Sequence, residues 1–162
     1  MISSEYSKNL SGIVSGKCYY IQSVATLKVF DIENESKDDR AKLIQNDFIP
    51  LKTSQQYKLD YHETDKAWTL EAQHSSKVID VPNSSNTEHV QIIQYTRHNR
   101  ANQKWLIEPA TKGQIGGDFV ITSVSSQLVL GVSGKSIVSG TAIEQVKENT
   151  MDVYQKFRLL PI

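Results

Sequence analysis

The sequence lacks the features that mark several large classes of protein. It has one cysteine, Cys18, among 162 residues, so no intramolecular disulfide can form, and the thiol is expected to be a small buried group in a strand. No apolar run approaches the roughly 18 residues of a membrane-spanning helix. The N-terminal stretch MISSEYSKNLSG lacks the apolar core of a secretory signal peptide. These absences predict a cytoplasmic protein, or one released by a non-conventional route, without membrane insertion.

A surplus of charge of one sign is also lacking. The chain has 18 basic and 18 acidic residues, spread along its length. Nucleic-acid-binding proteins usually carry a basic excess or a basic stripe, so nucleic acid is not an expected partner. The 4 histidines do not show the paired spacing of metal ligands, and a single cysteine cannot complete a structural zinc site. We therefore expect neither a metal nor another cofactor.

Motifs of common catalytic sites are missing as well. The run Gly12–Gly16 does not have the Gly-x-Ser-x-Gly spacing of a nucleophile elbow. The run Gly134–Ser136 ends like a phosphate-binding loop, but Val129 occupies the position of its leading glycine. The sequence therefore points to no catalytic residue.

What the sequence does contain is a pattern that occurs three times. Short strand-like runs end at Ile32, Val81 and Val132, at spacings of 49 and 51 residues. Each is followed by a Gln-x-aromatic tripeptide, and the three tripeptides are spaced by 48 and 52 residues: Gln55–Tyr57, Gln103–Trp105 and Gln155–Phe157. The length fits a single domain over residues 1–162, with a polar tail at 1–11 and repeats near 12–60, 61–110 and 111–162.

Repeats of this size, with about four short strands each, cannot bury their apolar faces alone and must share a core. Closure around a threefold axis also removes open sheet edges. The aromatic residues Tyr57, Trp105 and Phe157 are expected in this shared core, and each preceding glutamine is expected to hold turn backbone. The pattern predicts an all-β chain with threefold internal symmetry.

From about residue 16 to the end, the chain resembles the ricin-B-type, or Gln-x-Trp, family of β-trefoil lectins. Within this family it is similar to the single-domain cytoplasmic lectins of fungi. The resemblance implies a β-trefoil that is not an enzyme and that binds glycans containing galactose or N-acetylgalactosamine. It also implies agglutination of foreign glycans in defence, for which a homodimer would raise avidity.

The middle repeat matches the sugar-binding pattern of this family most closely. The resemblance assigns Asp80 as the acceptor of hydrogen bonds from ring hydroxyls and Tyr95 as the aromatic platform. It adds His98 at the rim, Asn102 as donor and acceptor, and Gln103 as a support for Asp80 or the turn. One residue departs from the pattern, because Ile93 stands where many relatives carry a glutamine.

The outer repeats match less well. In the first, Asp31 and Gln55 are present, but Ser54 replaces the asparagine and the platform would have to be Phe48, which makes this a weaker site. In the third, Gly131 replaces the aspartate and Tyr154 the asparagine, so this site is expected to be lost. No aromatic residue stands in the platform position there, which falls on Val146 or Lys147.

Two alternatives from other functional classes stay open. A trefoil of this size can act as a protease inhibitor or another protein-interaction module through its surface loops. A binding module of a larger glycosidase or toxin is a third interpretation, although Met1 and the run Leu159–Ile162 are typical of a complete protein. The aspartate, aromatic and asparagine of the middle repeat favour the lectin.

Overall fold

The computed structural model describes residues 12–111 and 117–162, so the tail expected at residues 1–11 lies outside the described part. Thirteen strands are found there: β1 (Lys17–Ser23), β2 (Val29–Ile32), β3 (Leu43–Asn46), β4 (Tyr57–His62), β5 (Ala67–Ala72), β6 (Val78–Asp80), β7 (Val90–Gln91), β8 (Ile93–Tyr95), β9 (Trp105–Pro109), β10 (Asp118–Ser123), β11 (Val129–Val132), β12 (Ile143–Val146) and β13 (Phe157–Pro161). Every helical segment of the described residues is a three-residue 3₁₀ turn: η1 (Glu33–Glu35), η2 (Thr53–Gln55), η3 (Pro82–Ser84), η4 (Ala101–Gln103), η5 (Ser133–Lys135) and η6 (Val153–Gln155).

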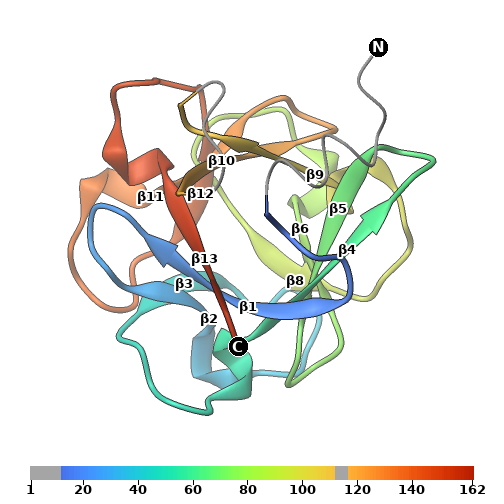
Figure 1. The fold of residues 1–162 in the computed structure, drawn as a ribbon, viewed down its shortest axis with the longest axis horizontal. Coiled ribbons are helices and arrows are strands. Elements are labelled where there is room, and N and C mark those ends of the chain that lie inside the picture. Colours follow the sequence, from blue (N-terminus) through green and yellow to red (C-terminus); the bar gives the residue numbers. More distant parts are fainter. Residues whose placement is uncertain (1–11, 112–116) are drawn as a thin grey trace.

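Six strands close into a barrel. Antiparallel pairing runs from β1 to β4, β5, β9, β10 and β13, and β13 pairs back to β1. Three hairpins lie beside the barrel: β2 with β3, β6 with β8, and β11 with β12. In Figure 1 the three repeats, coloured from blue to red, surround a common centre. The fold is the β-trefoil that the family resemblance implies, with the threefold symmetry that the repeats predict.

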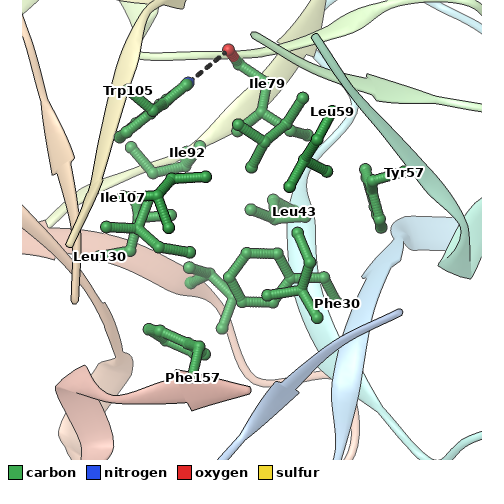
Figure 2. Packing of buried hydrophobic residues seen from close by; sticks show 14 of the residues in the cluster. Phe30, Leu43, Tyr57, Leu59, Ile79, Ile92, Trp105, Ile107, Leu130 and Phe157 are labelled. Atoms are coloured by element: carbon green, nitrogen blue, oxygen red, sulfur yellow. Dashed lines mark hydrogen bonds between the residues drawn. The ribbon is translucent and has the colours of Figure 1, made fainter. Parts of the chain in front are cut away.

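The three repeats share one hydrophobic core, as predicted. Tyr57, Trp105 and Phe157, the aromatic residues of the tripeptides, are fully buried. Figure 2 shows them around Leu43 and other aliphatic side chains of the core, and the Trp105 indole donates to the Ile79 carbonyl oxygen at 3.1 Å. Cys18 lies in β1 as predicted but is half-buried rather than buried.

The register of the three hairpins makes the repeats comparable residue by residue. In the second repeat Asp80 lies opposite Ile93, and Val78 lies opposite Tyr95. In the first repeat Asp31 lies opposite Ile44, and in the third repeat Gly131 lies opposite Glu144. Directly opposed residues of an antiparallel pair project from the same face of the sheet. The two residues of each pair therefore face the same surface of their repeat.

Three buried glutamines, Gln45, Gln94 and Gln145, join the repeats in a circle. Each side-chain amide nitrogen donates to two backbone carbonyls of the preceding repeat in cyclic order. For Gln94 these are the carbonyls of Ser36 and Asp38, at 2.9 and 2.8 Å. Each amide oxygen accepts from a hydroxyl of its own repeat. Because the glutamine side chains are buried, each amide depends on the loop of the preceding repeat for its acceptors.

We predict that Gln94→Ala lowers the free energy of unfolding by about 2–4 kcal/mol, because the Asp38 carbonyl loses this donor, the Ser36 carbonyl keeps only His74, and a small cavity opens. Chemical denaturation at neutral pH measures this. Gln22→Ala is the control, since its amide makes one exposed hydrogen bond, to Leu27, and its effect is expected within about 0.5 kcal/mol. Equal losses in the two variants would contradict the role of Gln94 between repeats.

Candidate functional site

A pocket of about 210 Å³ opens on the second repeat. It brings together four of the five residues assigned from the sequence, and Gln103 lies directly behind them. The lining residues are Arg40, Asp80, Pro82, Asn83, Ser84, Ile93, Tyr95, His98, Arg100 and Asn102.

Asp80 forms the base of this pocket at the end of β6 and is only 3% exposed. Its carboxylate accepts one hydrogen bond from Asn102 at 3.1 Å and one from Gln103 at 2.9 Å. Burial raises the pKa of the Asp80 carboxyl above its ordinary value, and the hydrogen bond from Gln103 and the nearby His98 offset this only in part. A carboxylate has about four acceptor positions, so Asp80 can take further donors.

Asn102 and Gln103 are held by the short turn η4. The Asn102 amide nitrogen donates to Asp80 and to the Val81 carbonyl, but its side-chain oxygen is buried without a hydrogen-bond partner. Gln103 donates to Asp80 and to the Thr96 carbonyl, and its oxygen accepts from the backbone amides of His98 and Asn99 in the loop before η4. Gln103 therefore supports both Asp80 and the turn, whereas Asn102 keeps a free acceptor.

Tyr95 and His98 stand at the rim of the pocket. Tyr95 ends strand β8, and its ring centre lies 6.2 Å from that of His98. His98 Nε2 lies 3.7 Å from Asp80 Oδ2, and His98 Nδ1 accepts a hydrogen bond from the Arg100 backbone. This bond places the ring proton of a neutral His98 on Nε2, toward the carboxylate. Ile93 forms part of the wall beside Asp80.

The sequence did not reveal Arg40, which comes from the first repeat. Its guanidinium lies 5.8 Å from the centre of the Tyr95 ring and donates to Asn83 at 3.3 Å. Its backbone amide donates to the Gln94 carbonyl, and its φ of 71° lies in the left-handed region. Equivalent positions are held by His89, which donates to Gln145, and by Gly140. Arg40 therefore reaches the second pocket from a neighbouring repeat, a contact that the spacing within one repeat does not show.

In the first repeat, the carboxylate of Asp31 is already saturated. It accepts from Ser54 at 2.7 Å, from Lys52 at 2.9 Å, and also from Asn46 and Gln55. Burial alone would raise the pKa of Asp31, but these four hydrogen bonds together lower it below its ordinary value. The Lys52 ammonium group and the other three donors thus use the acceptor positions of Asp31 that a ligand would need.

The structure does not place Phe48 where the sequence assigned the platform of the first repeat. In the strand register Asn46, opposite Val29, is the equivalent of Tyr95. Phe48 lies two residues further on, beyond the end of β3, and its ring packs edge-on against Tyr20 with ring centres 4.9 Å apart. Strand register is not visible in the sequence, where Phe48 is the nearest aromatic residue to this position.

The third repeat lacks the aspartate, and Gly131 fits closely there. A Cβ atom on this residue would lie 3.1 Å from Val146, which is the register equivalent of Tyr95. Without the carboxylate, Gln155 keeps its bonds to the loop backbone at Lys147 and Asn149. The glutamine of the tripeptide thus holds the turn in all three repeats, as predicted.

Neither a metal cluster nor a membrane span is found in the part of the chain that the structure describes. There, no group of three or more His, Cys, Asp or Glu side chains is arranged to hold a metal ion. Within the same residues no helix is long and apolar enough to cross a membrane.

Comparison with known proteins assigns the family. A model described as ricin-type β-trefoil lectin domain-like matches residues 10–95 and, in a second match, 53–146, so the chain belongs to this family. A search of curated proteins finds no match to the chain.

Solved structures share the fold. The designed threefold-symmetric protein ThreeFoil is 27% identical, with a TM-score of 0.81 over 90% of this chain and 99% of its own. The exo-β-1,3-galactanase 1,3Gal43A of Clostridium thermocellum is 23% identical, with a TM-score of 0.82 over 93% of this chain, which spans 31% of that enzyme. The ricin B-like lectin of Macrolepiota procera, solved with lactose, is 19% identical, with a TM-score of 0.75 over 91% of this chain and 96% of its own.

The two buried aspartates are predicted to affect stability in opposite ways. Asp31 has a lowered pKa, so its ionised form stabilises the fold above the unfolded-state pKa of about 3.9, and this contribution is lost as the pH falls. Asp80 has a raised pKa, so its ionised form opposes folding at neutral pH, and this effect disappears in acid.

We therefore expect Asp31→Asn to lower the free energy of unfolding at pH 7 by about 3 kcal/mol, because Lys52 loses its counter-charge. Asp80→Asn should lower it less, because it removes a carboxylate whose burial opposes folding, although its amide nitrogen then faces the donor of Asn102 or Gln103. Urea denaturation of both variants and the unchanged protein at pH 7 and pH 3 measures this, and the Asp31 variant should lose less stability on acidification. A larger loss of stability at pH 7 for Asp80→Asn than for Asp31→Asn would contradict the opposite effects of the two carboxylates.

Proposed function

We propose that the protein is a lectin that binds galactose- or N-acetylgalactosamine-type glycans at the second-repeat pocket, without catalysis. The observation that carries this proposal is the set of incompletely used acceptors at the pocket base. Asp80 has two hydrogen bonds, and the buried Asn102 oxygen has none. Adjacent hydroxyls of a sugar ring are donors that both groups can accept.

The rim of the pocket suits such a ring. Tyr95 stands next to the acceptors, and an aromatic face can cover the C–H groups of a sugar. Galactose and N-acetylgalactosamine have an axial 4-hydroxyl, which leaves one ring face apolar and turns two neighbouring hydroxyls to one side. The proposed pose puts these hydroxyls on Asp80 and Asn102 and the apolar face on Tyr95. The lactose complex of the Macrolepiota procera lectin supports a galactose-containing ligand by analogy.

The absence of catalysis is supported by the composition of the pocket. Glycoside hydrolysis usually requires two carboxyl groups on opposite sides of the bond that is cleaved. Among the described residues that line the pocket, Asp80 is the only one with a carboxyl group. The galactanase similarity covers only about a third of that enzyme, so it supports a binding module rather than the enzyme's activity.

A shallow pocket with so few contacts is expected to bind a single sugar with millimolar to micromolar affinity. Agglutination then requires at least two sites in one particle. A homodimer would provide them, and defence by agglutination is the use that we propose for such a protein.

A protein-interaction module is the second candidate, and one observation favours it. The loop after β3 exposes Phe48, Ile49 and Leu51, the last of which is 84% exposed. Apolar side chains grouped on one loop are a common feature of protein-binding surfaces. A protease inhibitor of this type would act through this loop and would not need Asp80.

We predict that Asp80→Ala weakens binding to galactosides at least tenfold, because the sugar hydroxyls lose their charged acceptor. A glycan array, with affinities confirmed by titration, measures this. Asp38→Ala is the control, since Asp38 is an exposed carboxylate of the neighbouring loop that does not line the pocket.

Binding that persists in the Asp80 variant would show that the sugar site is not the second-repeat pocket. If neither protein binds any glycan, protease panels with the substitution Leu51→Ala would test the second candidate.

A further inference from the structure

We infer that the third repeat carries a second sugar pocket, in which Glu144 replaces the missing aspartate from the opposite strand. The inference takes its ligand class, a galactose-type sugar, from the proposed function. It starts from the register: Gly131 is paired with Glu144, whereas Asp31 and Asp80 are each paired with an isoleucine. The repeat that lost its aspartate is therefore the one with a carboxylate at the paired position.

The geometry places this carboxylate in a pocket. A cavity of about 330 Å³ opens over the hairpin β11–β12, and Gly131, Glu144 and Tyr154 all line it. Ile93, the equivalent of Glu144, lines the second-repeat pocket in the same way. Opposed residues project from the same sheet face, and a glutamate reaches one methylene further than an aspartate. Gly131 has no side chain that could block this reach.

A residue from the preceding repeat completes the pocket, as in the second repeat. His89 holds the position equivalent to Arg40, with a φ of 68° and a backbone hydrogen bond to the Gln145 carbonyl. Its Nδ1 lies 2.9 Å from Glu144 Oε1. Together with His89 and Glu144, Tyr154 gives the pocket a carboxylate, an imidazole and an aromatic ring, the same groups that Asp80, His98 and Tyr95 supply.

The ion pair with His89 does not by itself explain why a glutamate stands at position 144. The Glu144 side chain is 10% exposed, whereas the His89 side chain is 70% exposed, so the pair is open to solvent on one side. A pair with one exposed partner contributes little to stability, while the buried carboxylate loses its hydration. In the other two repeats isoleucine serves the fold at this position. A carboxylate that accepts hydroxyls from a ligand explains the replacement.

Two pockets on different repeats would make a single chain bivalent. The protein could then cross-link glycans as a monomer, because each chain would engage two sugars at once. A homodimer would raise avidity as well, but only the second pocket would allow a monomer to cross-link glycans.

The test is an NMR titration of the full chain with methyl β-galactoside, which detects weak binding at each site. The amides of Gly131 and Tyr154 report on the third repeat, and those of Asp80 and Asn102 report on the second. Both sets are expected to shift. In Glu144→Gln the third-repeat set should require at least tenfold more sugar, while the second-repeat set responds as before and shows that the variant is folded. Glu148→Gln, a neighbouring exposed carboxylate outside this pocket, should change neither set.

Asp80→Asn gives the reciprocal pattern if the inference is correct, with loss at the second repeat alone. Shifts confined to the second repeat in the unchanged protein would overturn the second pocket and leave the proposed function standing. An unchanged third-repeat response in Glu144→Gln would also overturn it. If no amide shifts in either repeat, the proposed function fails for this sugar and the second pocket fails with it.

Discussion

The hydrogen bonds of three buried glutamines underlie the arrangement of the whole molecule. Gln45, Gln94 and Gln145 each tie a loop of the preceding repeat to a hairpin of their own repeat. A buried side-chain amide without acceptors costs about 1–3 kcal/mol, so each glutamine depends on the loop of the preceding repeat. The repeats therefore depend on one another through polar groups as well as through the shared hydrophobic core.

The same cyclic connection builds the pockets. The backbone carbonyl of each glutamine accepts a hydrogen bond from a residue of the preceding repeat, which therefore lies beside the hairpin. This residue is Arg40 at the second repeat, His89 at the third and Gly140 at the first. This backbone position has positive φ, where glycine is unstrained and other residues are uncommon. Arg40 and His89 are held there against that preference, and each of them lines a pocket. Each pocket thus belongs to two repeats.

Spacing in the sequence was enough to predict the threefold repeat and the buried aromatic residues, because these features recur within each repeat. The grouping of Asp80, Tyr95, His98 and Asn102 came from the resemblance to the lectin family. The spacing did not predict contacts across repeats, such as Arg40 over Tyr95, since no periodic signal joins them. Nor did it show that Asn46, rather than Phe48, is the register equivalent of Tyr95 in the first repeat, because strand register depends on pairing partners that a single stretch of sequence does not show.

What distinguishes the first two repeats is the degree to which each carboxylate is satisfied. Asp31 and Asp80 occupy equivalent positions and are both buried, yet Asp31 accepts four hydrogen bonds, one of them from the Lys52 ammonium, and Asp80 accepts two. The opposite directions of their pKa shifts follow from this difference. A buried acceptor that the protein satisfies itself contributes to folding, whereas one left incomplete at the base of a pocket can be completed by a ligand. An aspartate in the repeat pattern therefore does not by itself identify a binding site, and the residues that compete for its oxygens must be counted as well.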